Sequence, residues 1–139
     1  MREFIALTLV LLTTVAKAEE WVVLRKPSDP GQAGTPAILV DSTSVKILDN
    51  GIRSARGKFD FLADGHKVEA SDPSVLTMMI WVKSYDCKKQ MTHEESMEFH
   101  NCDGSVHTID VSNYPKWYPA PQNRLADPTI DFVCGWKPN

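Results

Sequence analysis

Alternating apolar and polar positions predict that this chain consists mainly of β-strands. Runs rich in β-branched and aromatic residues recur along it, and turn-forming residues separate them, which is typical of an antiparallel sheet. The runs occupy residues 20–26, 37–40, 45–48, 52–62, 75–85 and 105–111. The run at 75–85 is the longest of them, and its β-branched and aromatic content favours a central strand over a helix.

One further segment alternates over its whole length. The residues of one parity are mostly apolar, whereas every residue between them is polar; the first set is Met91, His93, Glu95, Met97 and Phe99. Because successive side chains of a strand point to opposite faces, we expect a half-buried strand with one wet face. Turn-forming residues at 101–104 follow it and predict a hairpin to the next strand.

Two local signals predict a turn and a helix. Asn50-Gly51 is typical of a type I′ hairpin turn, because both residues accept a positive φ. Asp127 followed by Pro128 is typical of a helix start and predicts a short helix over residues 128–134. We therefore expect an α+β fold, in which one C-terminal helix packs on an antiparallel sheet of about six strands.

The first residues have the form of a secretory signal peptide. A charged start at residues 1–3 precedes an apolar run at 4–15, and residues 16–18 have the small-x-small sequence Ala-Lys-Ala that a signal peptidase cuts. An apolar run of this length spans only about 18 Å as a helix, against a hydrocarbon core of roughly 30 Å. We therefore expect cleavage after Ala18, no stable membrane insertion, and one domain over residues 19–139.

Three cysteines in an oxidising compartment predict one disulfide and one cysteine left over. Cys87 and Cys102 lie at opposite ends of a predicted strand, roughly 40 Å apart when extended, whereas a disulfide requires Cα atoms within about 7 Å. Cys134 is therefore expected to pair with Cys87 or with Cys102. We favour Cys87, whose bridge would contribute about 4 kcal/mol in the chain-entropy model. Three reduced and buried cysteines are the alternative.

Charge limits the partners of the chain. Its net charge is −3, so we expect no binding to nucleic acid. Basic and aromatic residues nevertheless cluster around Cys87 and form a candidate contact for an acidic protein surface; they are Lys83, Tyr85, Lys88 and Lys89. An ordinary solvated sheet face is the alternative interpretation. Proteins are the expected partners, and a homodimer stays open.

A zinc site has little support in the sequence. His93-Glu94-Glu95 opens like the zinc-protease motif, which requires two histidines four residues apart on a helix. Met97 stands at the position of the second histidine, and the segment is predicted to be a strand. We therefore expect no catalytic residue, metal or cofactor.

An enzyme built on other residues is the alternative to a binding function. His100 and His107 would lie near each other at the tip of the predicted hairpin, where solvated side chains are the simpler interpretation. Cys102, beside Asp103 in the turn, is the candidate reactive thiol. A small periplasmic redox or metal-dependent enzyme would use Cys102 or the histidines.

Several short motifs together resemble a known family. They are Trp21 in the opening strand, Val40-Asp41-Ser42-Thr43-Ser44-Val45, Ser84-Tyr85-Asp86-Cys87, Asp103-Gly104, Trp117-Tyr118-Pro119-Ala120-Pro121 and Phe132-Val133-Cys134. In this order they resemble the surface-adhesin protein E-like family of Gram-negative bacteria. The resemblance covers nearly the whole chain after the predicted signal peptide.

The resemblance implies a small envelope domain with an antiparallel sheet, a terminal helix and a disulfide at the positions of Cys87 and Cys134. It also implies non-catalytic binding, since the founding adhesin attaches to matrix and serum proteins such as laminin and vitronectin. That adhesin is a lipoprotein, whereas this chain has Glu19 after the predicted cleavage site. We therefore expect a periplasmic or secreted protein that is not a lipoprotein and that contacts host matrix or envelope proteins through its sheet surface. Cys102 has no counterpart in the family pattern.

Overall fold

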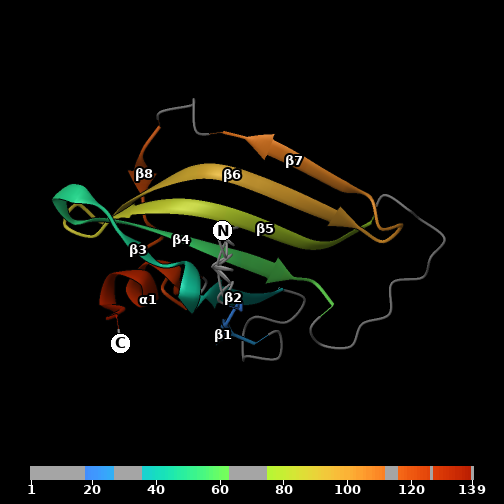
Figure 1. The fold of residues 1–139 in the computed structure, drawn as a ribbon, viewed down its shortest axis with the longest axis horizontal. Coiled ribbons are helices and arrows are strands. Elements are labelled where there is room, and N and C mark those ends of the chain that lie inside the picture. The colour runs from blue at the N-terminus through green and yellow to red at the C-terminus, as the bar shows by residue number, and fades with distance from the viewer. Residues whose placement is uncertain (1–17, 27–35, 63–74, 112–115, 126, 139) are drawn as a thin grey trace, which may run out of the picture.

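The fold is a single antiparallel sheet with one short helix at its C-terminal end (Figure 1). A computed structural model describes residues 18–26, 36–62, 75–111, 116–125 and 127–138. The predicted signal peptide, residues 1–18, therefore lies almost wholly outside the described residues. None of the helices in these ranges is long and apolar enough to cross a membrane.

Among the described residues, eight strands make up the sheet, and six of them form its main path in the order β1-β2-β4-β5-β6-β7. These six are β1 Trp21–Arg25, β2 Ala37–Asp41, β4 Ile52–Asp60, β5 Leu76–Asp86, β6 Met91–Asn101 and β7 Val106–Asp110. The two short strands are β3 Lys46–Ile47, which pairs with β4, and β8 Tyr118–Pro119, which pairs with β6. The helix α1 is Thr129–Gly135. The predicted fold class is confirmed.

The core lies between α1 and one face of the sheet, which we call the helix face. Trp81 and Tyr85 on β5 are buried there against Ile130 and Val133 of α1. Because residues paired across an antiparallel sheet share a face, the register of Trp81 with Gly57 continues this face onto β4. We call the opposite side of the sheet the open face.

Gly57 allows the sheet to hold its largest buried side chain. A Cβ atom at Gly57 would lie only 2.0 Å from Cζ2 of Trp81. The indole ring therefore lies directly on the β4 backbone, a close approach that only glycine permits. This contact fixes where the Trp81 ring lies on the helix face.

The hairpin predicted at Asn50-Gly51 is confirmed. Asn50 has φ 61° and Gly51 has φ 77°, both in the left-handed region that the sequence favours there. The hairpin is closed by a hydrogen bond from the Leu48 amide to the Ile52 carbonyl at 2.8 Å. The predicted helix is present but begins one residue later than expected: Pro128 is its N-cap rather than its first residue, and Asp127 just before it accepts a hydrogen bond from the Thr129 amide at 3.1 Å.

The expectation that one face of β6 is wet is wrong. Val82 pairs with Ser96 and Lys83 with Glu94, so Glu95 is an extra residue that forms a β-bulge. Beyond the bulge the alternation of side chains is reversed. The odd-numbered residues before Glu95 therefore point to the open face, and the odd-numbered residues after it point to the helix face. Thr92 and His93, before the bulge, point to opposite faces and are both buried, His93 beneath the ring of Trp117.

The disulfide between Cys87 and Cys134 is confirmed, with the two Cα atoms 5.6 Å apart. It joins the end of β5 to the last turn of α1. Arg53 makes a second connection to the helix, because its Nη1 donates to the carbonyl oxygens of Val133 at 2.9 Å and Trp136 at 2.5 Å. These carbonyls lie at the helix C-terminus, where they lack intrahelical partners and favour a cation.

Candidate binding site at the turn end of the sheet

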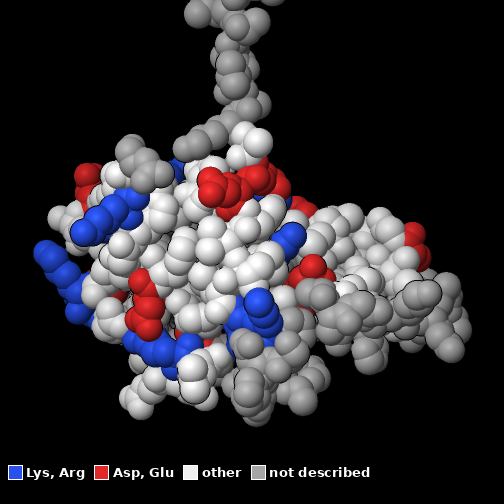
Figure 2. Space-filling model, turned by 90° about the horizontal axis from the view of Figure 1, so that it is seen from below, with Lys and Arg blue, Asp and Glu red and all other residues white. Residues whose placement is uncertain are grey.

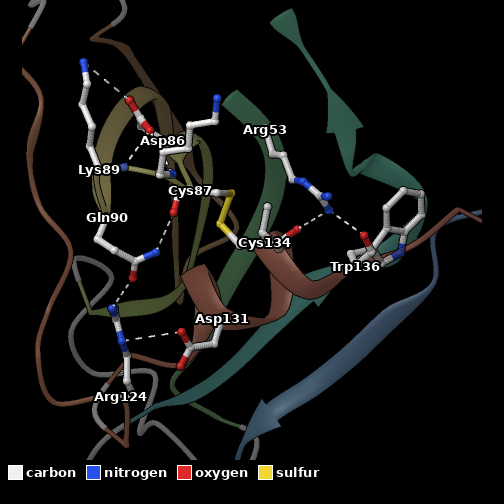
Figure 3. Close-up of a disulfide and its surroundings, with 11 residues drawn as sticks. Arg53, Asp86, Cys87, Lys89, Gln90, Arg124, Asp131, Cys134 and Trp136 are labelled. Atoms are coloured by element: carbon white, nitrogen blue, oxygen red, sulfur yellow. Dashed lines mark hydrogen bonds and ion pairs between the residues drawn. A yellow bond between two sulfur atoms is a disulfide. The ribbon is translucent and has the colours of Figure 1, made fainter. Parts of the chain in front are cut away.

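The turn after β5 is held in one conformation by its own side chains. Asp86 Oδ1 accepts hydrogen bonds from the amides of Lys88 at 3.1 Å and Lys89 at 2.9 Å. Gln90, with φ 55°, donates from Nε2 to the Cys87 carbonyl at 2.9 Å. The disulfide anchors the same turn to α1 (Figure 3). Lys88 and Lys89 are therefore presented from an ordered backbone.

Arg124 connects this turn to the helix a second time. Its Nη2 donates to Oε1 of Gln90 at 2.6 Å, and its Nε lies 3.6 Å from Oδ1 of Asp131 on α1 (Figure 3). The guanidinium thus bridges two elements that are far apart in the sequence. We call the part of the molecule that carries the 87–90 turn and the Asn50-Gly51 hairpin the turn end.

Tyr85 is not part of any exposed contact surface, so its assignment as a binding residue is wrong. Its side chain is fully buried on the helix face, packed into the core with α1. Burial raises the pKa of the Tyr85 hydroxyl well above its ordinary value, because the charged phenolate would lose its hydration. Tyr85 stabilises the core instead.

Lys83 is likewise separated from the other two lysines. Its Nζ lies 4.9 Å from the centroid of the Trp81 ring and 3.6 Å from Oε1 of Glu94, and only 12% of its side chain is exposed. Lys88 and Lys89 are exposed, and 79% of the Lys89 side chain contacts solvent. The predicted four-residue patch therefore reduces to the two lysines of the turn.

Lys89, one of these two lysines, lines an apolar groove on the open face. The groove has a volume of about 250 Å³ and is lined by Ile52, Asp86, Lys89, Met91 and Trp117. Three of these residues form one row across the sheet, since Ile52 pairs with Asp86 and Asp86 with Met91. The floor is apolar, and the Lys89 and Asp86 side chains, 3.9 Å apart, supply the charged rim.

Trp117 forms one wall of the groove and is itself held by a stacked ring. Its centroid lies 5.4 Å from that of His93, with an angle of 30° between the planes. Trp117 is half-buried on the open face of the sheet, opposite the core that α1 covers. Its place in a groove could not be predicted, because the pairing of β6 with β8 is not visible in the sequence.

The exposed apolar surface continues from the groove onto the neighbouring hairpin. Leu48 is 45% exposed, and its hydrogen bond to Ile52 places it next to the groove. The Lys88 side chain lies over the same hairpin, since a Cβ atom at Gly51 would be 3.4 Å from its Cε. We call the groove residues together with Leu48 and Lys88 the turn-end patch. Basic and acidic side chains both lie at this end of the molecule (Figure 2).

A polar cluster next to the groove lacks the geometry of a nucleophilic site. Oε1 of Glu95 lies between Ser84, whose hydroxyl donates at 2.8 Å, and Nδ1 of His93 at 3.0 Å. A serine nucleophile requires the imidazole between the hydroxyl and the carboxylate, so that the ring can take the proton. Here the carboxylate occupies the middle, and the cluster orients His93 under Trp117.

The other candidate residues for chemistry lie apart. His107 pairs with Phe99 and His100 with Val106, so the two histidines are on opposite faces of the β6-β7 hairpin. Cys102 is unbonded and half-buried in the hairpin turn. Within the described ranges, no three residues among His, Cys, Asp and Glu are close enough to hold a metal ion.

Comparison with known proteins gives one match in structure. No family model matches the chain, and no curated protein shows significant sequence similarity to it. Among solved structures, the chain is similar to crystal form II of Haemophilus influenzae protein E. This match names the same protein as the family resemblance. The superposition has a TM-score of 0.44 at 14% identity and covers 82% of this chain and 96% of the other. We argue function from this chain's own residues.

Proposed function

We propose that this chain is an exported, non-catalytic domain that binds a protein partner through the turn-end patch. The observation that carries the proposal is an exposed apolar groove with Lys89 in its lining and exposed Lys88 over the neighbouring hairpin, both presented from a turn that a disulfide anchors. Apolar pockets with charged rims are typical of protein contact surfaces. The resemblance to the adhesin family supports the same class of function.

The chemistry of the patch defines the partner. An apolar side chain of the partner would enter the groove between Met91 and Trp117, and carboxylates beside it would lie near Lys88 and Lys89. Buried aromatic anchors contribute most of the affinity of such contacts, whereas exposed rim charges mainly raise the association rate. Matrix, serum or envelope proteins with acidic segments are the candidates that follow from the resemblance.

Export is the second part of the proposal. The Cys87–Cys134 bridge supports it, because disulfides persist in oxidising compartments such as the periplasm. We place the mature protein in the periplasm or outside the cell, with cleavage after Ala18 and no lipid anchor. The intact mass of the purified product tests this directly: retention of residues 1–18 or addition of a lipid would contradict it.

Binding to immobilised laminin, vitronectin and envelope proteins tests the patch. The variant Lys88→Glu/Lys89→Glu should lower the association rate with the bound partner by about tenfold at low salt. Trp117→Ala should raise Kd by about tenfold, mainly through faster dissociation. The matched control Lys26→Glu/Lys137→Glu makes the same charge change at exposed lysines outside the patch.

The control should bind like the unaltered protein, and circular dichroism would establish that all variants are folded. Equal binding by both lysine pairs, or full binding by folded Trp117→Ala, would show that the partner contacts another surface. Failure of every candidate protein to bind the unaltered chain would contradict the proposed function itself.

A further inference from the structure

A second surface, unrelated to the turn-end patch, is the free edge of β7. This strand is the last in the sheet order, so β6 pairs with one side of it and the other side has no strand neighbour among the described residues. It forms one edge of the sheet in Figure 1, and all five of its residues are exposed. An edge of this kind presents unpaired backbone groups that another strand can use.

The backbone groups that face outwards can be assigned from the hydrogen bonds at both ends of the hairpin. The Val111 amide donates to the Glu95 carbonyl, and the Asn101 amide donates to the Ser105 carbonyl, each at 3.0 Å. Backbone groups alternate in direction along a strand, so residues 105, 107, 109 and 111 face β6. The N–H and C=O groups of Val106 and Thr108 therefore point away from the sheet.

The side chains of the edge suit a strand of particular composition. Val106 is 52% exposed on the open face, and Ile109 is 39% exposed on the helix face, so each face offers an apolar contact. The β6-β7 hairpin is also acidic: residues 91–111 include Glu94, Glu95, Glu98, Asp103 and Asp110 but no lysine or arginine. Glu94 is already paired with Lys83 on β5, and Glu98, Asp103 and Asp110 supply the negative charge nearest the edge, which attracts cations.

We propose that the β7 edge binds an extended, basic segment of a partner protein by strand addition. The segment would continue the ladder through Val106 and Thr108, with apolar side chains against Val106 or Ile109 and lysines or arginines near the hairpin carboxylates. Pairing with β7 of a second copy is disfavoured, because it would bring two acidic hairpins together. The occupant is thus a different, basic chain.

This site is independent of the proposed function. The β7 edge lies beside residues 96–100 of β6, whereas the turn-end patch uses Met91 and the preceding turn. The two sites also select opposite charges. The variant Lys88→Glu/Lys89→Glu should therefore leave binding at the β7 edge intact, so that failure at one site can be told from failure at the other.

The test uses the full mature chain and a short labelled peptide of alternating lysine and valine. Binding is measured by fluorescence polarisation, and amide hydrogen exchange locates the contact. We expect saturable binding and slowed exchange at Val106 and Thr108. A peptide with glutamate in place of lysine should not bind. An N-methylated lysine peptide, which keeps its charge but loses backbone donors, should bind about tenfold more weakly.

A variant of the edge gives the matched control. Thr108→Pro removes an outward-facing donor that β6 does not use, so the fold should persist while peptide affinity falls about tenfold; Thr108→Ala keeps the donor and should bind normally. Should Thr108→Pro fail to fold, the N-methylated peptide on the unaltered protein decides the question. Equal binding of methylated and unmethylated peptides, or protection elsewhere than β7, would overturn the proposal.

Discussion

At the scale of single residues, one packing contact of the core joins a glycine and a tryptophan. The ring of Trp81 lies on the backbone of Gly57, where a Cβ atom would be 2.0 Å from Cζ2. The ring cannot move away without leaving the core that it fills with Tyr85 and α1. Protein interiors are packed too densely to absorb such an overlap by small shifts.

Gly57→Ala should therefore lower the free energy of unfolding by about 3 kcal/mol, measured by urea denaturation. Gly135→Ala is the control, because a Cβ atom there has no neighbour within 4 Å, and it should leave stability nearly unchanged. Equal stability of Gly57→Ala and the unaltered protein would show that the ring does not lie on β4.

The Tyr118 hydroxyl loses its proton at alkaline pH, and this makes the stability of the fold depend on pH in that range. Burial and the adjacent Glu94 carboxylate raise the pKa of its hydroxyl to about 12, from an ordinary value of 10.0. The folded state thus holds its proton more tightly than the unfolded state. Its contribution to stability is complete below about pH 10 and is lost as the pH rises towards 12.

We expect Tyr118→Phe to flatten the loss of stability between pH 10 and pH 12, because phenylalanine has no proton to lose. Urea denaturation at a series of pH values measures this slope. A slope as steep in Tyr118→Phe as in the unaltered protein would contradict the assignment. Tyr85 supplies a similar alkaline loss in both proteins, since burial also raises its pKa.

The predicted exposure of single residues was correct in the turn after β5 and wrong on β5 itself. Lys88 and Lys89 lie in a turn, where exposure follows from local sequence. Lys83 and Tyr85 share a parity with Trp81, so alternation places all three on one face. Which face α1 covers depends on tertiary packing, and the sequence around Cys87 contains no signal for it. These basic and aromatic residues are therefore neighbours in the sequence, but the fold separates Lys83 and Tyr85 from Lys88 and Lys89.

At the scale of elements, the disulfide and Arg53 attach a helix that is too short to be stable alone. The helix α1 has seven residues, well below the length at which isolated helices persist. The Cys87–Cys134 bridge spans a sequence separation of 47 residues, which makes the reduced unfolded chain considerably more disordered than the oxidised one.

Replacing both bridged cysteines by alanine should lower the free energy of unfolding by about 4 kcal/mol. Denaturation of the double variant without reductant measures the loss, and Cys102→Ser serves as the control because Cys102 is unbonded. A loss smaller than that of Cys102→Ser would mean that the bridge contributes nothing to the fold.

Local signals predicted the hairpin at Asn50-Gly51 and the start of α1, because both depend on residues close in sequence. The β-bulge at Glu95 could not be predicted. It follows from the pairing of β6 with β5, and a regular alternation in sequence conceals it. Because of the bulge, Met91 lies on the open face with Asp86, whereas Met97 and Phe99 of the same parity lie on the helix face with Trp81.

At the scale of the whole molecule, two surfaces of opposite charge lie on different parts of one sheet. Figure 2 shows lysines and arginines at the turn end and in the middle of this view, with acidic side chains among them. The β6-β7 hairpin adds five acidic residues and no lysine or arginine. A partner approaching this protein would therefore be oriented by charge before contact.

The sequence predicted the class of fold, the number of main strands, the terminal helix and the disulfide. It did not predict the strand order, in which β2 pairs with β4 while β3 lies off the main path. Strand order determines that Ile52, Asp86 and Met91 form one row, so it also determines the groove. The groove could therefore be identified only once the pairing of the strands was known.

Hydrogen exchange of the oxidised mature protein, alone and with a bound matrix or envelope protein, tests the central claim most directly. We expect slowed exchange in the hairpin at 48–52 and in the turn at 86–91, with no change in α1. Protection confined to α1, or spread over the sheet without the turn, would contradict the claim that the turn-end patch is the contact surface.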